Sequence, residues 1–199
     1  MQRRDLIAAG GTFALAALVA TEAHATPTSS SAASHVVDVV RFGAIGDGRT
    51  LDTKAFKDAG SELKSNGGGT LYIPPTKRSY LLDEDIQLWN NVNVVYDGFV
   101  KRANNDKRTF DAVFIPVPGA QHVTFTNAKI DCGNVPGING IIIRRNNRFC
   151  RIAGAYIRNS VHDPGKTGGG RAIVLEDGVT DGLPKQTIAT DIFLSLIHI

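Results

Sequence analysis

The chain has 199 residues, of which 42% are hydrophobic and 21% are charged, and its formal net charge at pH 7 is +3. This length leaves room for one domain with a sizeable core, even after a targeting segment is subtracted. The sequence has no Cys and His cluster at zinc-ligand spacing, no phosphate-binding glycine loop and no Ser-His-Asp signature, which excludes those site classes. The mild positive charge, including Lys101, Arg102, Lys107 and Arg108, would suit an anionic sugar as well as nucleic acid.

Residues 1–25 have the features of a bacterial export signal. Arg3 and Arg4 precede a modest apolar run, and residues 23–25, Ala-His-Ala, fit a small-x-small cleavage site. A twin arginine ahead of such a run predicts an exported, periplasmic or extracellular protein, with no nucleic-acid partner and no membrane attachment after cleavage. A membrane anchor is the alternative, although the apolar run is shorter than the roughly 20 residues that span a bilayer. Residues 26–35 are predicted to be a flexible leader because they are rich in Ser and Thr.

The most distinctive stretch, residues 42–53, reads Phe-Gly-Ala-Ile-Gly-Asp-Gly-Arg-Thr-Leu-Asp-Thr. Its glycines predict a tight turn into a helix, which apolar residues at helical spacing place at about Thr53–Ser65. Asp52 or Thr53 would cap the free amides of the first helical turn, and Asp47 would accept hydrogen bonds from turn amides and hold the helix in place. The motif argues against a nucleotide site because it lacks the lysine and threonine of a phosphate loop. The predicted structural cap motif comprises Gly43, Gly46, Asp47, Gly48, Asp52 and Thr53.

Two short strands flank this turn and helix. Val36–Val40 precedes the Gly-Asp-Gly turn, and Thr70–Ile73 follows three glycines and ends at two prolines. This order of elements resembles the start of the pectate-lyase-like superfamily of right-handed parallel β-helix proteins, which includes polygalacturonases, rhamnogalacturonases and pectate lyases. The resemblance is close from about Val37 to Leu82. It implies a helix that caps the first coil and a protein that acts on a polysaccharide.

Downstream of the helix, short apolar runs separated by Gly, Asn, Asp and Pro predict an all-β chain. The runs repeat at an offset of 27 or 28 residues, as expected for a parallel β-helix in which equivalent residues of successive coils form columns. A β-sandwich is the alternative, because it also uses short strands at regular spacing. The proposed columns pair Phe114 with Ile142, Val123 with Cys150, Phe125 with Ile152, Ile130 with Ile157, and residues 172–175 with 141–143.

The same alignment bears on the two cysteines. Cys150 would point inward under Val123, whereas Cys132 would lie at a turn over Asn159, so we expect no disulfide between them.

The β-helix domain is predicted to occupy residues 36–193. Residues 194–199, Leu-Ser-Leu-Ile-His-Ile, match the translation of a sequencing adapter and are expected to be a non-native tail. We therefore expect the β-helix to be truncated at its C-terminus, with its last coil uncapped.

Two turns carry the candidate catalytic residues. Asp131 and the adjacent pair His162 and Asp163 follow corresponding strands, where side chains of neighbouring coils could converge. Asp is equally typical of turns, in which it accepts hydrogen bonds from its own backbone.

Arg144 and Arg145 are candidate substrate-binding residues, because arginines can grip the carboxylates of acidic sugars. An ion-pair ladder with Glu176 and Asp177, one coil further on, is the alternative. The acidic run at residues 83–85 is expected to be a solvated turn. No metal site or cofactor is predicted, although a lyase could use calcium.

The resemblance implies an exported glycosidase or polysaccharide lyase that cleaves a pectin-like or other uronate-containing chain. Hydrolysis would require two carboxyl groups, and elimination would require a base together with a cation or arginine. The Asn-Thr-Asp, Asp-Asp, Gly-His-Gly and Arg-Ile-Lys motifs of polygalacturonases are absent. The alternative is a non-catalytic carbohydrate-binding protein, similar to tail-spike or adhesin β-helices. The oligomeric state stays open.

Overall fold

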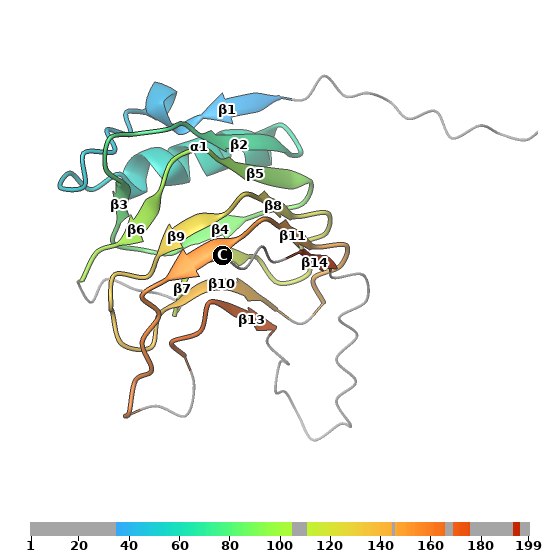
Figure 1. Ribbon diagram of the computed structural model, residues 1–199. Coiled ribbons are helices and arrows are strands. Elements are labelled where there is room, and N and C mark those ends of the chain that lie inside the picture. Colours follow the sequence, from blue (N-terminus) through green and yellow to red (C-terminus); the bar gives the residue numbers. More distant parts are fainter. Residues whose placement is uncertain (1–34, 105–110, 145, 166–168, 176–192, 196–199) are drawn as a thin grey trace, which may run out of the picture. The chain divides into compact units, whose positions relative to one another are not determined.

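The computed structural model describes residues 35–104, 111–144, 146–165 and 169–175, together with the backbone of residues 193–195 (Figure 1). The predicted export signal, the leader up to residue 34, Arg145 and the pair Glu176 and Asp177 lie outside the described residues. So does most of the predicted tail.

Three parallel sheets form the body of the structure, as the repeat predicted. The first sheet has six strands in the order β1 (Val36–Asp38), β2 (Gly69–Ile73), β5 (Val92–Tyr96), β8 (Thr124–Thr126), β11 (Arg151–Ala153) and β14 (Phe193–Ser195). The second has four, β3 (Tyr80–Leu82), β6 (Val100–Arg102), β9 (Lys129–Asp131) and β12 (Tyr156–Arg158). The third has four, β4 (Ile86–Leu88), β7 (Ala112–Pro116), β10 (Asn139–Ile143) and β13 (Ile173–Leu175). Each coil passes through the first, second and third sheets in turn, which makes the fold a parallel β-solenoid.

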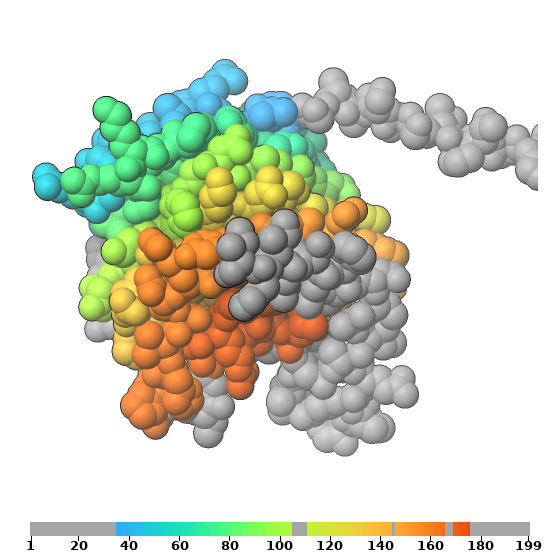
Figure 2. All heavy atoms as spheres, in the orientation of Figure 1, coloured from blue at the N-terminus to red at the C-terminus, as the bar shows by residue number. Residues whose placement is uncertain are grey.

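Successive coils lie on one another in the order of the sequence (Figure 1), and the surface colours run in the same order from blue to orange (Figure 2). Side chains that face inward form apolar columns, such as Val94, Phe125 and Ile152 in the first sheet. The predicted pairs of Phe125 with Ile152 and of Ile130 with Ile157 are confirmed.

One predicted column is wrong by a single residue. Phe114 lies opposite Ile141 and not opposite Ile142. Ile141 and Ile143 belong to the main core, whereas Ile142 packs in a separate cluster with Ala112 and Ile115. Three consecutive isoleucines gave the sequence pattern no means of choosing which of them faces inward.

The single α-helix of the described chain, α1 (Thr53–Ser65), covers the first coil as predicted (Figure 1). Phe56 is fully buried, and its ring packs 5.5 Å from that of Tyr80 and 6.4 Å from that of Phe114. The strand predicted at Val36–Val40 is shorter, because residues 39–42 form a 3-10 helix, η1 (Val39–Phe42). No helix among the described residues is long and apolar enough to cross a membrane.

The side chains of Asp52 and Thr53 do not cap α1, contrary to the prediction. Asp52 occupies the N-cap position, but its carboxylate accepts hydrogen bonds from the amides of Ile45, Gly46 and Leu81, at 2.6, 3.3 and 3.1 Å. The hydroxyl of Thr53 donates to Asp83 at 2.5 Å. Both side chains therefore tie the helix to the turn before it and to the coil beneath it.

The acidic run at residues 83–85 is not the exposed turn that the sequence predicted. Asp83 and Asp85 are each only 4% exposed, whereas Glu84 forms an ion pair with Lys57 on α1. These three residues connect β3 to β4 under the helix, which removes two of them from solvent.

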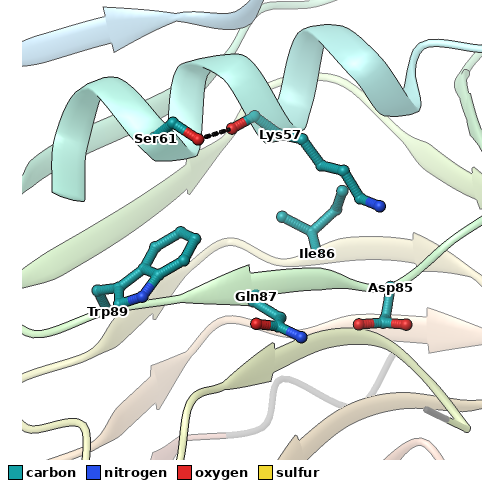
Figure 3. A pocket seen from close by; sticks show the side chains of 6 residues that line it. All are labelled: Lys57, Ser61, Asp85, Ile86, Gln87 and Trp89. Atoms are coloured by element: carbon teal, nitrogen blue, oxygen red, sulfur yellow. Dashed lines mark hydrogen bonds between the residues drawn. The ribbon is translucent and has the colours of Figure 1, made fainter. Parts of the chain in front are cut away.

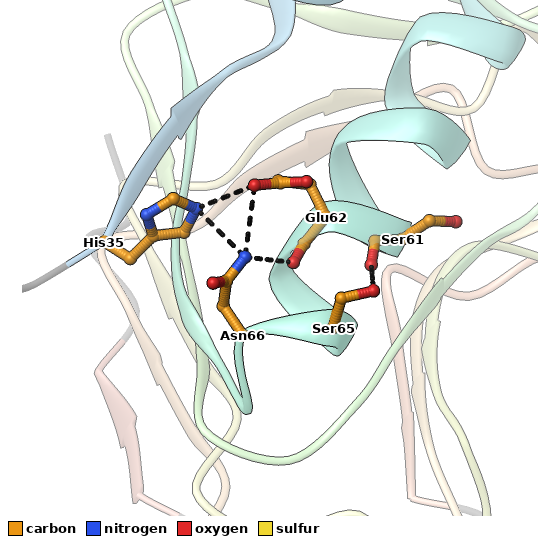
Figure 4. A network of polar contacts seen from close by, with 5 residues as sticks. All are labelled: His35, Ser61, Glu62, Ser65 and Asn66. Carbon is orange, nitrogen blue, oxygen red and sulfur yellow. Dashed lines mark hydrogen bonds and ion pairs between the residues drawn. The ribbon is translucent and has the colours of Figure 1, made fainter.

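A polar cluster joins the end of α1 to the residue before β1 (Figure 4). His35 Nε2 lies 3.5 Å from Glu62 Oε1, and Asn66 Nδ2 donates to the Glu62 carbonyl at 2.8 Å. In the same last turn Ser65 donates to the carbonyl of Ser61 at 3.0 Å. These contacts hold the N-terminal strand against the helix end.

Cys132 and Cys150 are both free and fully buried. Cys150 faces the core as expected. Cys132 is also in the core, although the alignment placed it at a turn.

Candidate functional site

The outward face of the second sheet places three charged residues in one column. Lys101 lies opposite Asp131, which in turn lies opposite Arg158 in the next coil. Neighbouring parallel strands are about 4.8 Å apart, so this register sets a carboxylate between two cationic side chains.

The carboxylate of Asp131 is held by neighbours on both sides. One oxygen accepts from Asn159 Nδ2 at 2.9 Å and from the Gly133 amide at 2.8 Å, and the other accepts from Arg158 Nε at 3.0 Å. Burial by itself would raise the pKa of Asp131, but the hydrogen bonds from Asn159 and Gly133 and the charge of Arg158 together lower the pKa below its ordinary value of 3.8. Asp131 is therefore ionised at neutral pH.

Lys101, Asp131 and Arg158 border a pocket of about 290 Å³, which we name the basic pocket. The Gly-Asp-Gly turn reaches it through Gly48, whose amide donates to the carbonyl of Ser79 at 2.9 Å. Three cationic side chains and one carboxylate surround the pocket, so its charge is net positive. Its lining consists of Gly48, Arg78, Ser79, Phe99, Lys101, Asp131 and Arg158.

Phe99 lines the basic pocket next to Arg158 and packs against the ring of Tyr156. The rings of Phe99 and Tyr156 lie 6.0 Å apart at 90°, and the Arg158 guanidinium carbon is 5.5 Å from the Phe99 ring centre. Arg158 is thus positioned by Phe99 on one side and by Asp131 on the other.

Of the predicted catalytic residues, only Asp131 lines the basic pocket. His162 is exposed, and Asp163 Oδ1 accepts a hydrogen bond from the Gly165 amide at 3.0 Å, a local turn contact. Neither His162 nor Asp163 belongs to the pocket lining. The structure does not bring the three candidates into one site, and their catalytic role stays a prediction.

Arg144 lies directly after β10, away from the basic pocket. It is partly buried, and its backbone amide donates to Asn147 Oδ1 at 2.8 Å. Its predicted role in substrate binding stays a prediction, as does that of Arg145.

The glycines and Asp47 of the predicted cap motif form the turn before α1, whereas Asp52 and Thr53 do not cap the helix. Asp47 accepts hydrogen bonds from the amides of Arg49 and Thr50 at 2.8 and 2.7 Å, as predicted for a turn residue. Gly46 and Gly48 have φ angles of 65° and 71°, which favour glycine. The residue that ties the turn to the helix start and to the coil below is Asp52 and not Asp47.

The prediction missed Arg78, Lys101, Phe99 and Arg158 as site residues. A usable signal existed for Arg158, because the alignment of Ile130 with Ile157 also sets Asp131 against Arg158. Arg78 lies in the connection before β3, which no repeat pattern covers.

A second pocket, of about 240 Å³, lies between α1 and β4 (Figure 3). Two of its polar side chains already have partners: Ser61 donates to the Lys57 carbonyl at 2.9 Å, and Lys57 pairs with Glu84. Lys64 Nζ lies 4.8 Å from the ring centre of Trp89. We interpret this pocket as the boundary between the cap helix and the first coils. Within the described ranges, no group of three or more His, Cys, Asp or Glu residues could hold a metal ion.

Comparison with known proteins gives two partial sequence matches. The chain is 52% identical over 50 residues to the Probable polygalacturonase of Vitis vinifera, which is 24% of this chain and 10% of that protein. It is 48% identical over 46 residues to polygalacturonase ADPG1 of Arabidopsis thaliana, which is 23% of this chain and 11% of that protein. The matches thus span about a tenth of the length of these relatives. No protein-family model matches the chain.

Two solved structures are also similar. Geobacillus virus E2 ORF18 matches 59% of this chain and 25% of its own, with 25% identity and a TM-score of 0.48. A candidate glycosyl hydrolase of Parabacteroides merdae matches 70% of this chain and 80% of its own, with 14% identity and a TM-score of 0.43.

The coil architecture and the sequence matches point to the same group. Three parallel sheets wind into a solenoid behind one N-terminal helix, and both sequence relatives are polygalacturonases by name. These features fit the pectate-lyase-like superfamily of right-handed parallel β-helix proteins.

Proposed function

We propose that the protein binds an acidic polysaccharide, such as a pectin-like chain with uronate residues, and cleaves it. The charge of the basic pocket carries this proposal. Three cationic side chains face one carboxylate, and that carboxylate is already bound to Arg158. Arg78 and Lys101 form no ion pair with any residue that the structure describes, so both remain available to a sugar carboxylate.

The state of Asp131 limits the chemistry that the basic pocket supports. An ionised carboxylate can accept a proton, but it cannot protonate a leaving oxygen, and the other six lining residues include no second carboxyl group. Hydrolysis requires such a pair. Elimination requires a base and a cationic group that neutralises the uronate carboxylate. The residues of the basic pocket fit this requirement better. The names of the two sequence relatives favour hydrolysis instead. The chemical nature of the cleavage product therefore distinguishes hydrolysis from elimination.

The test of binding removes the two available cations. We expect the double variant Arg78→Ala, Lys101→Ala to bind polygalacturonate roughly 30-fold more weakly or worse, because each of the two lost charged contacts is worth about 1 kcal/mol or more. Titration calorimetry at two salt concentrations measures the change. Lys54→Ala is the matched control, since Lys54 is an exposed lysine on α1 that pairs with Asp58. Equal binding by the double variant and the control would refute the role of the basic pocket.

The test of cleavage follows the products of polygalacturonate incubated with the full chain. New reducing ends without absorbance from unsaturated uronates would indicate hydrolysis, and both signals together would indicate elimination. Retained binding without either signal would favour the second candidate function, a non-catalytic carbohydrate-binding protein. That candidate is supported by the fully engaged carboxylate of Asp131.

We also propose that the protein is exported, on the basis of Arg3, Arg4 and the apolar run that follows them. N-terminal sequencing of the protein recovered outside the cytoplasm tests this. A start at Thr26 would support export through signal cleavage, and retention of Met1 in a cytoplasmic product would contradict it.

A further inference from the structure

Two aromatic residues occupy equivalent places in adjacent coils, just before strands of the first sheet. His122 lies two residues before the start of β8, and Phe149 holds the matching position before β11. The His122 amide donates to the Arg148 carbonyl at 3.0 Å, which fixes this register. The two rings lie 4.7 Å apart and within 10° of parallel. We name this pair the aromatic platform.

Both residues have a backbone conformation that their side chains disfavour. The φ angles are 56° for His122 and 54° for Phe149, in the left-handed region that glycine and asparagine enter more readily. The equivalent positions of the two preceding coils hold Gly68 and Asn91, with φ angles of 130° and 60°. The backbone thus has a positive φ at this position in all four coils, and two of the four fill it with residue types that suit it.

Core packing does not explain the aromatic choice. Phe149 is 44% exposed, and His122 is also exposed. Each ring can shield at most one face of the other, so apolar ring surface stays in contact with water. A bulky residue in a strained, exposed position is the pattern expected of a binding residue.

The surroundings of the aromatic platform select the chemistry of its ligand. Gln121 and Arg148, the residues before each ring, are exposed and pair across the two coils. A flat aromatic surface beside an amide and a guanidinium matches a pyranose ring, whose apolar C–H face stacks while its hydroxyl and carboxylate groups accept hydrogen bonds. The positive charge of Arg148 favours an acidic sugar over a neutral one.

We propose that His122 and Phe149 bind one pyranose ring of an acidic polysaccharide by stacking, at a site that shares no residue with the basic pocket. The identity of this ligand rests on the proposed function. The aromatic platform would act as a second binding site for the same polymer, at a different position around the coil from the basic pocket.

The test uses the residue that the fold itself places in this position. Phe149→Asn copies Asn91, relieves the backbone strain and removes the ring. We expect its binding to polygalacturonate oligosaccharides to weaken about five- to tenfold, as for a central aromatic contact, while its thermal midpoint stays equal or rises. Calorimetry and scanning fluorimetry measure the two quantities on the full chain. Phe149→Trp is the matched control, because it keeps a flat ring at the same φ and should retain binding.

Each other outcome decides against the aromatic platform. Wild-type affinity in Phe149→Asn would overturn it, even if the basic-pocket variant loses binding as expected. A fall in thermal midpoint of several degrees in Phe149→Asn would assign the ring a structural role and also overturn it. Failure of the wild-type chain to bind the oligosaccharides would refute this site together with the proposed function. His122→Asn is a second test of the aromatic platform, and we expect the same loss of affinity and no loss of stability.

Discussion

Asp52 accepts hydrogen bonds from three backbone amides that belong to two separate segments of the chain. It is 2% exposed, and it joins the glycine turn at residues 45–46 to the start of β3 at Leu81. Asp47 also accepts three hydrogen bonds, but all of them come from the next three residues of its own exposed turn. Asp52 and Asp47 thus accept the same number of hydrogen bonds, but Asp52 is buried and Asp47 lies in an exposed turn.

We expect Asp52→Ala to destabilise the fold by about 2 to 3 kcal/mol, because a buried amide left without an acceptor costs about 1 to 3 kcal/mol and the amides of Gly46, Ile45 and Leu81 are buried or partly buried. Asp47→Ala should have a clearly smaller effect, since water replaces the lost acceptor. Urea denaturation of both variants measures the difference. Equal losses of stability would show that burial does not distinguish these two aspartates.

The sequence could identify these residues as structural but could not assign their partners. Local spacing predicted that Asp47 binds the amides of its own turn, which is confirmed. The partner Leu81 lies 29 residues beyond Asp52, and its amide is within reach only because of how the first coil closes. The same limit applies to the site. Asp131 could be picked from its place at the end of a strand, whereas Arg78, 53 residues earlier in the chain, lines the same pocket only because of how the coils fold.

Helix α1 depends on one central side chain for its hold on the coils. Phe56 is fully buried and touches rings of the second and third sheets, Tyr80 on β3 and Phe114 on β7. Ala59 and Gly60 are also buried, and a side chain at Gly60 would meet the Trp89 ring at 3.5 Å. Small residues on this face let the helix approach closely, so Phe56 fills the space between helix and coils.

We expect Phe56→Ala to cost about 3 to 5 kcal/mol, the range for removing a buried aromatic ring from a core. Loss of the ring would leave a cavity between Tyr80 and Phe114 that the stiff coil cannot close. The helical signal in circular dichroism and the urea midpoint should fall together. Lys54→Ala, on the exposed side of the same helix, should change the free energy of unfolding by no more than about 0.5 kcal/mol. A cost below about 1 kcal/mol for Phe56→Ala would mean that the cap is not anchored through this ring.

Elements with strong local signals were predicted well. The bounds of α1 agree with the predicted Thr53–Ser65, because apolar spacing and the glycines after Asn66 mark both ends. The strand at Val36–Val40 was predicted too long, since a valine run does not reveal the 3-10 turn at Val39. The acidic run at residues 83–85 was assigned to solvent by its charge, but the helix above it buries two of its three members.

At the scale of the whole molecule, the repeat in the sequence predicted the solenoid because each coil repeats the same inward positions. In the second sheet, Ile130 and Ile157 hold one such position in adjacent coils. Their surroundings differ. Ile130 is fully buried between Val100 and Ile157, whereas Ile157 lies in a strand, β12, whose residues are all half-buried or exposed.

This difference predicts unequal stability along the stack. In a solenoid each coil contacts mainly its neighbours, so a local loss spreads only as far as the coupling between coils allows. Ile130→Ala should cost about 2 to 5 kcal/mol and lower the hydrogen-exchange protection of the coils on both sides of it. Ile157→Ala removes the same atoms from a less buried site and should cost about half as much or less, with loss of protection confined to β12 and its contacts. Equal costs for the two variants, or a global loss of protection in both, would show that the described coils unfold as one unit.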